Sequence, residues 1–173
     1  RAYKDNVKGF WEVGSTYSNS VSLEQANDRT SFRTSLTYLD NEWMMPNTGF
    51  NRFNFAGSLS HNLNDRLKIS TKLAYSRMKS DNLPATGYNN QSISYFMIFQ
   101  NPNVDLKWYQ PIWKNGQEQI DQIHPFSSFI DNPYLIAYEM LNGVDKRTIS
   151  GSMTVDYNFN NHFSMMFRSG IEV

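Results

Sequence analysis

Three histidines are the residues of this chain best suited to acid–base or metal chemistry, and their spacing argues against both. His61, His124 and His162 are scattered along the 173 residues. No two of them have the i, i+4 spacing of a metal-binding helix, and no HExxH, P-loop or GxSxG motif occurs. The chain has no cysteine, which excludes thiolate nucleophiles, thiolate metal sites and disulfides. We therefore expect a protein that is not an enzyme, with no catalytic residue, no metal and no cofactor.

An aromatic cluster around Pro111 is the best candidate for contact with a substrate. Trp108, Tyr109 and Trp113 lie on both sides of this proline, and Tyr95 precedes them in the same stretch. Exposed aromatic rings can stack on sugars or pack on peptide side chains. The same rings could form the internal core of a long loop or its contact with a partner protein, and we favour that structural interpretation.

The composition argues against nucleic acid as a partner and is unusual for a cytosolic enzyme. The 16 basic and 16 acidic residues balance to a net charge of zero, whereas phosphate binding needs a basic excess. Charged residues make up 18% of the chain and aromatic residues 15%. Such a polar, uncharged and aromatic-rich composition is typical of a membrane barrel, whose wall is apolar on the outside and faces water on the inside. No apolar run approaches the roughly 18 residues that mark a membrane helix.

A two-residue period, repeated in six segments, is the dominant signal of the sequence. In one segment, for example, Leu67, Ile69 and Leu73 alternate with Lys68 and Ser70. A strand places successive side chains on opposite faces, so each segment has one apolar and one polar face. The pattern predicts three antiparallel hairpins, with a long loop over residues 80–145. The six strands are expected near residues 13–24, 29–40, 50–62, 66–79, 146–159 and 163–173.

Three features favour a membrane wall over a soluble sandwich. The segments run about 10–13 residues, close to the roughly 9–11 that a tilted strand needs to cross a bilayer. The connections alternate between short and long, as the periplasmic turns and extracellular loops of outer-membrane barrels do. The polar face is rich in hydroxyl groups and carries the four cations that we expect to face a water-filled lumen: Arg33, Lys68, Lys72 and Arg168.

The aromatic residues of the apolar face are grouped into two bands. Between the bands the face is mostly aliphatic and includes Gly57 and Gly151. Two aromatic bands around an aliphatic belt are what two membrane interfaces select. In a soluble sandwich, the same rings would be ordinary core residues. The bands comprise Phe32, Tyr157, Phe159 and Phe163 near the short turns, and Tyr17, Tyr38, Phe53 and Tyr75 near the long loops.

These observations predict an all-β fold, namely an antiparallel transmembrane β-barrel segment with one long, partly helical extracellular loop. Closing an outer-membrane barrel takes about eight strands, and plugged transporters have about 22. Six strands leave two edges unpaired, so we expect an incomplete barrel. Helices are expected within the loop at residues 92–100, where Ile93, Phe96 and Met97 have helical spacing, and at residues 133–141, after a cap at Asp131–Asn132. Residues 103–130 give no clear pattern.

Several short segments follow one another along the chain in a recognisable order. They are Phe10–Gly14, Tyr17–Leu23, Asn27–Ser35, Pro46–Gly49, Asn51–Phe55, Leu63–Leu67, Ser80–Pro84, Asp131–Tyr134, Asn142–Gly143 and Arg147. In this order they resemble the barrel of SusC/RagA-family TonB-dependent outer membrane transporters. The resemblance implies a barrel closed by an internal plug, import of glycans or peptides driven by the TonB complex, and a SusD-like surface lipoprotein as partner. In that family the plug and the TonB-contacting segment precede the barrel, and both are absent from this sequence.

The expected function is therefore nutrient uptake across the outer membrane of a Gram-negative cell, with membrane lipid around the wall. A soluble β-sandwich carbohydrate-binding module that uses the aromatics from Trp108 to Trp113 is an alternative. An outer-membrane adhesion or structural barrel without TonB coupling is another. The sandwich requires the apolar face to be buried inside the protein, whereas the barrel requires it to face lipid. The sequence does not distinguish glycan from peptide as the substrate.

Overall fold

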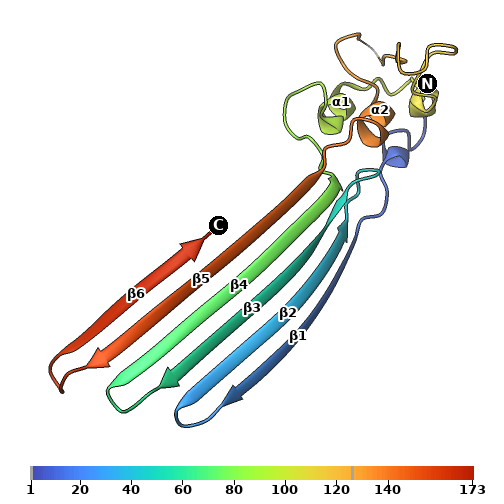
Figure 1. Cartoon of the computed structure of the whole chain (residues 1–173). Coiled ribbons are helices and arrows are strands. Elements are labelled where there is room, and N and C mark those ends of the chain that lie inside the picture. Colours follow the sequence, from blue (N-terminus) through green and yellow to red (C-terminus); the bar gives the residue numbers. More distant parts are fainter. Residues whose placement is uncertain (1, 126) are drawn as a thin grey trace. The chain divides into compact units, whose positions relative to one another are not determined.

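The structure is a computed structural model, and it describes residues 2–125 and 127–173. Its main element is one six-stranded sheet in which the strands pair in chain order, β1 to β6, as Figure 1 shows. The predicted all-β, antiparallel sheet is confirmed, although β4 ends at Asn82 rather than near residue 79. The strands are β1 (Ser15–Ala26), β2 (Thr30–Glu42), β3 (Gly49–Asn62), β4 (Leu67–Asn82), β5 (Val144–Asn158) and β6 (Ser164–Glu172).

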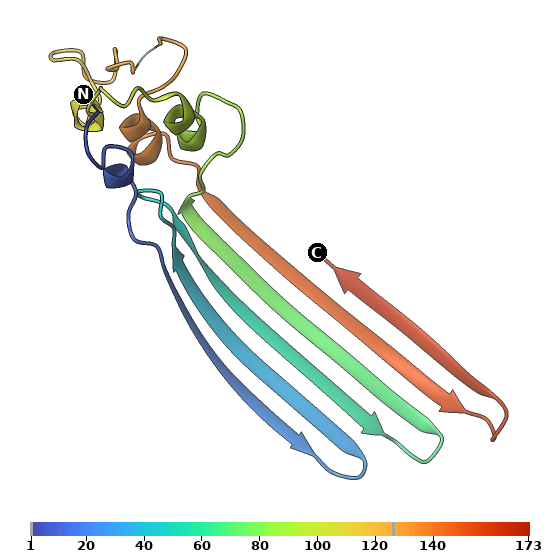
Figure 2. The same ribbon diagram turned by 180° about the vertical axis from the view of Figure 1, so that it is seen from behind.

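The three short turns, β1–β2, β3–β4 and β5–β6, are built in the same way. In each turn an asparagine side-chain oxygen accepts hydrogen bonds from the backbone N–H groups two and three residues later. The three asparagines are Asn27, Asn64 and Asn160, with donor–acceptor distances between 2.7 and 3.0 Å. An asparagine in this arrangement replaces the backbone acceptor of a turn, so the hairpin closes in a few residues. The three turns lie at the same end of the sheet (Figure 2).

One face of the sheet carries polar side chains that hydrogen-bond across neighbouring strands. These bonds satisfy the hydroxyl and amide groups of the face in cross-strand pairs, the arrangement that stabilises antiparallel sheets. The pairs are Ser20 with Thr37 (3.0 Å), Ser60 with Ser70 (3.1 Å), Ser76 donating to Asn54 (2.8 Å) and Arg168 donating to Thr154 (3.3 Å).

The opposite face of the sheet is apolar and exposed. Across β5 and β6, Val155 lies opposite Phe167 and Gly151 opposite Ile171. A Cβ added at Gly151 would lie 3.8 Å from both Ile171 Cγ2 and Leu73 Cδ1, which places the three residues on one face. The exposed side chains of this face include Val21 (73%), Leu23 (62%), Leu36 (48%), Leu73 (51%), Phe167 (57%) and Ile171 (66%).

The chain forms two compact units, of which the sheet unit comprises residues 17–40, 51–79 and 145–173. The second, here called the loop unit, comprises residues 2–16, 41–50 and 80–144. Among the described residues, the buried hydrophobic side chains all belong to the loop unit. They are Phe10, Ile93, Tyr95, Phe96, Leu106, Tyr109, Ile130, Leu135, Ile136 and Ala137. The hydrophobic core is therefore in the loop unit, and no described residue of the sheet unit is a buried hydrophobic one.

Two short α-helices occur in the loop unit where the sequence predicts them. The first, α1 (Ile93–Phe99), begins after Ser92, whose hydroxyl accepts a hydrogen bond from Tyr95 N. The second, α2 (Pro133–Tyr138), ends before the predicted residue 141 because the N–H groups of Glu139 and Met140 both donate to Leu135 O. Two 3₁₀ turns, η1 (Lys8–Phe10) and η2 (Leu106–Tyr109), were not predicted. None of the described helices is long and apolar enough to cross a membrane.

Candidate functional site

The aromatic cluster predicted from sequence divides into core rings and surface rings. Tyr95 and Tyr109 are 9% and 5% exposed and belong to the hydrophobic core of the loop unit. Tyr109 makes an edge-to-face contact with Phe96, at a centroid distance of 6.1 Å. Edge-to-face packing stabilises a core beyond the area that it buries. Tyr95 and Tyr109 are therefore part of the packed core of the loop unit.

Trp108 and Trp113 keep surface that a ligand could reach. Trp108 is 55% exposed and makes an edge-to-face contact with Tyr3 at 5.9 Å. Trp113 is partly buried, and its Nε1–H donates to a carboxylate oxygen of Glu139 at 3.2 Å. A tryptophan whose N–H group is already hydrogen-bonded can still stack the face of its ring on a sugar. Contact of these tryptophans with substrate stays a prediction.

A buried asparagine that sequence reasoning identified only as a helix cap organises this region. Asn132 is completely buried, and its Oδ1 caps α2 by accepting from Tyr134 N at 2.9 Å. Its Nδ2 donates to Tyr109 O at 2.9 Å and to Ile123 O at 3.1 Å. The side chain therefore ties the start of α2 to two backbone segments that approach it from η2 and from residue 123. The Asn–Pro pair in the sequence signals the cap but gives no sign of the other two bonds.

The backbone next to Trp113 adopts an unfavourable conformation. Ile112 has φ +65°, a left-handed value that is a clear outlier for a β-branched residue. Ile112 O accepts from Ile123 N at 2.7 Å, and Lys114 N donates to Asp121 O at 3.0 Å. The segment therefore turns back on itself between Trp113 and residue 122. Such local strain persists only where the surrounding contacts hold it, and it occurs often at functional sites.

Burial raises the pKa of the core tyrosine hydroxyl of Tyr109 above its usual value of 10.0, and a hydrogen bond with Gln100 offsets part of the increase. The folded state then holds this proton more tightly than the unfolded state does. Its contribution to stability is complete below about pH 10 and is lost as the pH rises towards the folded-state pKa. Burial likewise raises the pKa of Tyr134.

We expect alkaline pH to destabilise the loop unit through Tyr109. In the wild type, stability should fall as the pH rises above about 10. A Tyr109→Phe variant should show a smaller fall over the same range, because the titrating group is gone. Urea unfolding at several pH values, followed by tryptophan fluorescence, measures this. Tyr17→Phe, at a position in the sheet unit that is 65% exposed, is the control, and an equal change in both variants would contradict the expectation.

Two of the four predicted lumen-facing cations lie together on the sheet. Arg33 and Lys72 line one hollow of about 800 Å³, together with Glu172. The rest of its wall is mostly small side chains such as Ser35 and Ala56. Arg33 also lies 3.9 Å from Glu24, in an exposed ion pair. Such a pair adds little stability because water screens it.

The other two cations lie elsewhere on the sheet. Lys68 lines a second hollow of about 580 Å³ near the short turns, with Arg29 and Asp156. The guanidinium of Arg168 donates to the Thr154 hydroxyl, on the polar face of β5 and β6. The four cations are thus distributed along the sheet and do not form one site. That they face a lumen stays a prediction.

Comparison with known proteins assigns the chain to no family. The chain matches no family model, and no curated protein matches it. Within residues 2–125 and 127–173, no three His, Asp or Glu side chains are grouped so that they could hold a metal ion. The features of the chain that bear on its function are therefore the two faces of the sheet and the exposed aromatic side chains of the loop unit.

Proposed function

We propose that the six-stranded sheet is an arc of a transmembrane β-barrel in a Gram-negative outer membrane, and that the protein carrying it imports nutrients. The observation that carries the proposal is the apolar face of the sheet, which is exposed from Val21 on β1 to Ile171 on β6. Soluble monomers rarely expose contiguous apolar patches larger than a few hundred Å². Covering a Leu or Phe side chain is worth about 1.5–3 kcal/mol, so this face needs an apolar neighbour.

Lipid is the neighbour that fits the pattern on this face. The aliphatic side chains lie between two groups of aromatic rings, and Phe53 contacts Tyr75 at the group near the long connections. Rings of this kind prefer the boundary between hydrocarbon and water. The opposite face is hydroxyl-rich and carries Arg33 and Lys72, as expected for a wall that faces water.

A barrel also accounts for the two edges of the sheet. β1 and β6 each have one neighbouring strand. An unpaired backbone group costs several kcal/mol in hydrocarbon, so open edges do not persist in a bilayer. Further strands must then continue the sheet on both sides, and about eight is the smallest number that closes. The closed barrel is part of the proposal.

The proposed activity is TonB-dependent uptake of a glycan or peptide, together with a SusD-like surface lipoprotein. Its support is the resemblance of the strand and turn segments to SusC/RagA transporters. Surface aromatics such as Trp108, which is 55% exposed, are available for contact with the substrate or the lipoprotein. Loss of uptake in cells that lack TonB would support this activity. Uptake that persists without TonB would contradict TonB coupling, and no uptake by the wild type would favour an adhesion or structural barrel.

A soluble β-sandwich binding module remains the second candidate, and one observation weighs against it. A sandwich needs a second layer over the apolar face, and the described residues form a single sheet. The side chains that such a layer would cover, among them Leu23 and Leu73, are more than half exposed.

Leu73→Arg in the native polypeptide should block assembly into the outer membrane. Leu73 lies on the apolar face in the middle of β4, where an arginine costs about 2–4 kcal/mol near the bilayer midplane. Ser70→Arg is the matched control, since Ser70 lies on the polar face of the same strand, 3.1 Å from Ser60. Cations at Lys68 and Lys72 already occupy the neighbouring positions of that face. The yield of folded, detergent-extracted protein from outer membranes measures assembly.

The control should assemble at close to the wild-type level. Normal assembly of Leu73→Arg would overturn the membrane proposal, because a lipid-facing position at mid-strand does not tolerate a charge. Recovery of the wild type in the soluble fraction would overturn it as well. In that case the sandwich module, with Trp108 and Trp113 as the residues to test, becomes the working interpretation.

A further inference from the structure

Two arginines on neighbouring strands share one carboxylate on the sheet unit. Arg77 of β4 donates to both oxygens of Asp145 on β5, from Nε at 3.0 Å and from Nη2 at 2.7 Å. Arg147, two residues further along β5, donates from Nη2 to the same carboxylate at 3.2 Å. We call Arg77 and Arg147 the arginine pair. The strands that carry it are joined by the long connection, so the pair forms only when β4 and β5 are in register.

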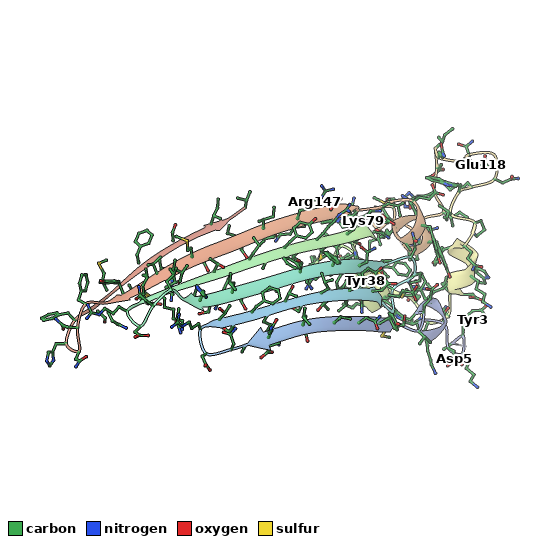
Figure 3. All side chains as sticks on the ribbon, turned by 60° about the horizontal axis from the view of Figure 1, so that its bottom comes forward. Tyr3, Asp5, Tyr38, Lys79, Glu118 and Arg147 are labelled. Atoms are coloured by element: carbon green, nitrogen blue, oxygen red, sulfur yellow. The ribbon has the colours of Figure 1, made fainter. Side chains whose placement is uncertain are left out.

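The arginine pair lies on the apolar face, next to an aromatic band. Arg77 follows Tyr75 by two residues, and residues two apart on a strand share a face. Tyr75 contacts Phe53 on β3, at a centroid distance of 6.3 Å. Arg147 shares its face with Gly151, four residues further along β5, which lies next to Leu73 and Ile171. Figure 3 labels Arg147 with Lys79 and Tyr38 near the end of the strands that leads into the long connections.

The charge of the cluster does not cancel. Two guanidinium groups share one carboxylate, which leaves a net charge of plus one, and their side chains are 42% and 61% exposed. The hydrogen bonds to Asp145 use the Nε and Nη2 edge of each guanidinium group, so Nη1 of both arginines can donate to a ligand. The shared carboxylate also holds the two cations side by side, where each would otherwise repel the other.

We propose that the arginine pair binds the phosphate of a membrane lipid headgroup, with the acyl chains of that lipid against the aliphatic part of the same face. The inference rests on the proposed function, since it requires the apolar face to meet a bilayer. Guanidinium groups bind phosphate with several directed hydrogen bonds, and they do so best when they are held in place. Cationic residues at the level of the headgroups attract anionic lipids.

The position of the cluster favours a lipid over free phosphate. Tyr75 and Phe53 lie beside it on the face, and Leu73 lies beyond them towards mid-strand. A ligand with a phosphate at one end and hydrocarbon at the other contacts the arginines and this apolar surface together. Free phosphate contacts the arginines alone, at an exposed site where water competes.

The test uses the native polypeptide, extracted from outer membranes in mild detergent and then stripped of lipid. It is incubated with equal amounts of dioleoyl phosphatidic acid and dioleoylglycerol, which differ only in the phosphate. Native mass spectrometry counts the adducts of each. We expect phosphatidic acid to be retained about tenfold better, the ratio that corresponds to 1.4 kcal/mol. An excess of inorganic phosphate should not displace it.

Two matched variants assign the preference to this cluster. Arg77→Gln/Arg147→Gln should retain the two lipids equally, whereas Arg33→Gln/Lys72→Gln, which removes two charges from the polar face, should keep the wild-type preference. The wild-type comparison holds even if a variant fails to fold. Equal retention of both lipids by the wild type would overturn the inference, as would an unchanged preference in the first variant or displacement by inorganic phosphate.

These outcomes are separate from those of the proposed function. A wild type that is found in outer membranes but shows no preference for phosphatidic acid overturns the lipid site and leaves the barrel intact. A wild type that is absent from outer membranes overturns both.

Discussion

Asn132→Ala is expected to unfold the loop unit or to leave its aromatic segment disordered. The side chain is completely buried and makes three hydrogen bonds, to Tyr134 N, Tyr109 O and Ile123 O. Removing it leaves two backbone carbonyls without this donor, at about 1–3 kcal/mol for each buried group that stays unpaired. Loss of the cap of α2 adds about 1 kcal/mol. The total, about 3–7 kcal/mol, is a large fraction of the stability of a small unit.

Limited proteolysis of the native polypeptide measures this effect, since an unfolded loop unit is cut between η2 and α2. Asn89→Ala is the matched control, because Asn89 also bonds two backbone groups but is exposed. Asn132→Asp keeps the oxygen that caps α2 and loses the two donated bonds. It should therefore be destabilised nearly as much as Asn132→Ala. Full protection of Asn132→Asp would show that capping alone explains the role of this residue.

The sheet was predictable because its signals are local. Alternation of polar and apolar residues depends only on the two-residue period of a strand, and it gave all six strands. The short turns are local too, since each begins with an asparagine whose bonds reach no further than three residues. Strand ends were less predictable. β4 continues past residue 79 to Ser80 and Asn82, where the alternation no longer contrasts polar with apolar positions, and side-chain bonds tie both residues to other backbone segments.

Residues 103–130 were not predictable because their structure depends on distant partners. Asn6 donates to Val104 O at 2.6 Å and accepts from Leu106 N at 2.9 Å, across about one hundred residues of chain. Asn132 N donates to the side chain of Gln122 at 2.7 Å. Such bonds leave no periodic pattern in the sequence. A segment held by side-chain-to-backbone bonds therefore has no signal that a window of neighbouring residues could reveal.

The candidate sites show the same limit. Aromatic residue type identified Tyr95, Tyr109, Trp108 and Trp113, but it could not separate the two buried rings from the two that reach the surface. Burial depends on which segments pack together, and the sequence does not state it. The arginine pair was missed for a related reason. Arg77 and Asp145 are 68 residues apart, and only the register of β4 against β5 brings them together.

Phe96→Ala should destabilise the loop unit by about 3–5 kcal/mol, the usual cost of emptying a buried phenylalanine site. Phe96 is 0% exposed and is among the largest fully buried side chains of the described chain. Its ring contacts Tyr109 edge to face, so the substitution removes core volume and the support of that tyrosine together. Because α1 has only seven residues, its stability comes from this packing rather than from its own hydrogen bonds.

Phe99→Ala is the control for this prediction, since Phe99 is on the same helix but 49% exposed. Urea unfolding of the loop unit, which contains all four tryptophans of the chain, can be followed by their fluorescence. It should show a large loss of stability for Phe96→Ala and a loss of about 1 kcal/mol or less for Phe99→Ala. Assembly in the outer membrane should persist in both variants, because the strands that we propose contact lipid are unchanged. Equal losses would contradict a core centred on Phe96. They would indicate instead that the exposed rim of α1, where Phe99 contacts Tyr95 at 5.0 Å, carries as much of the packing energy.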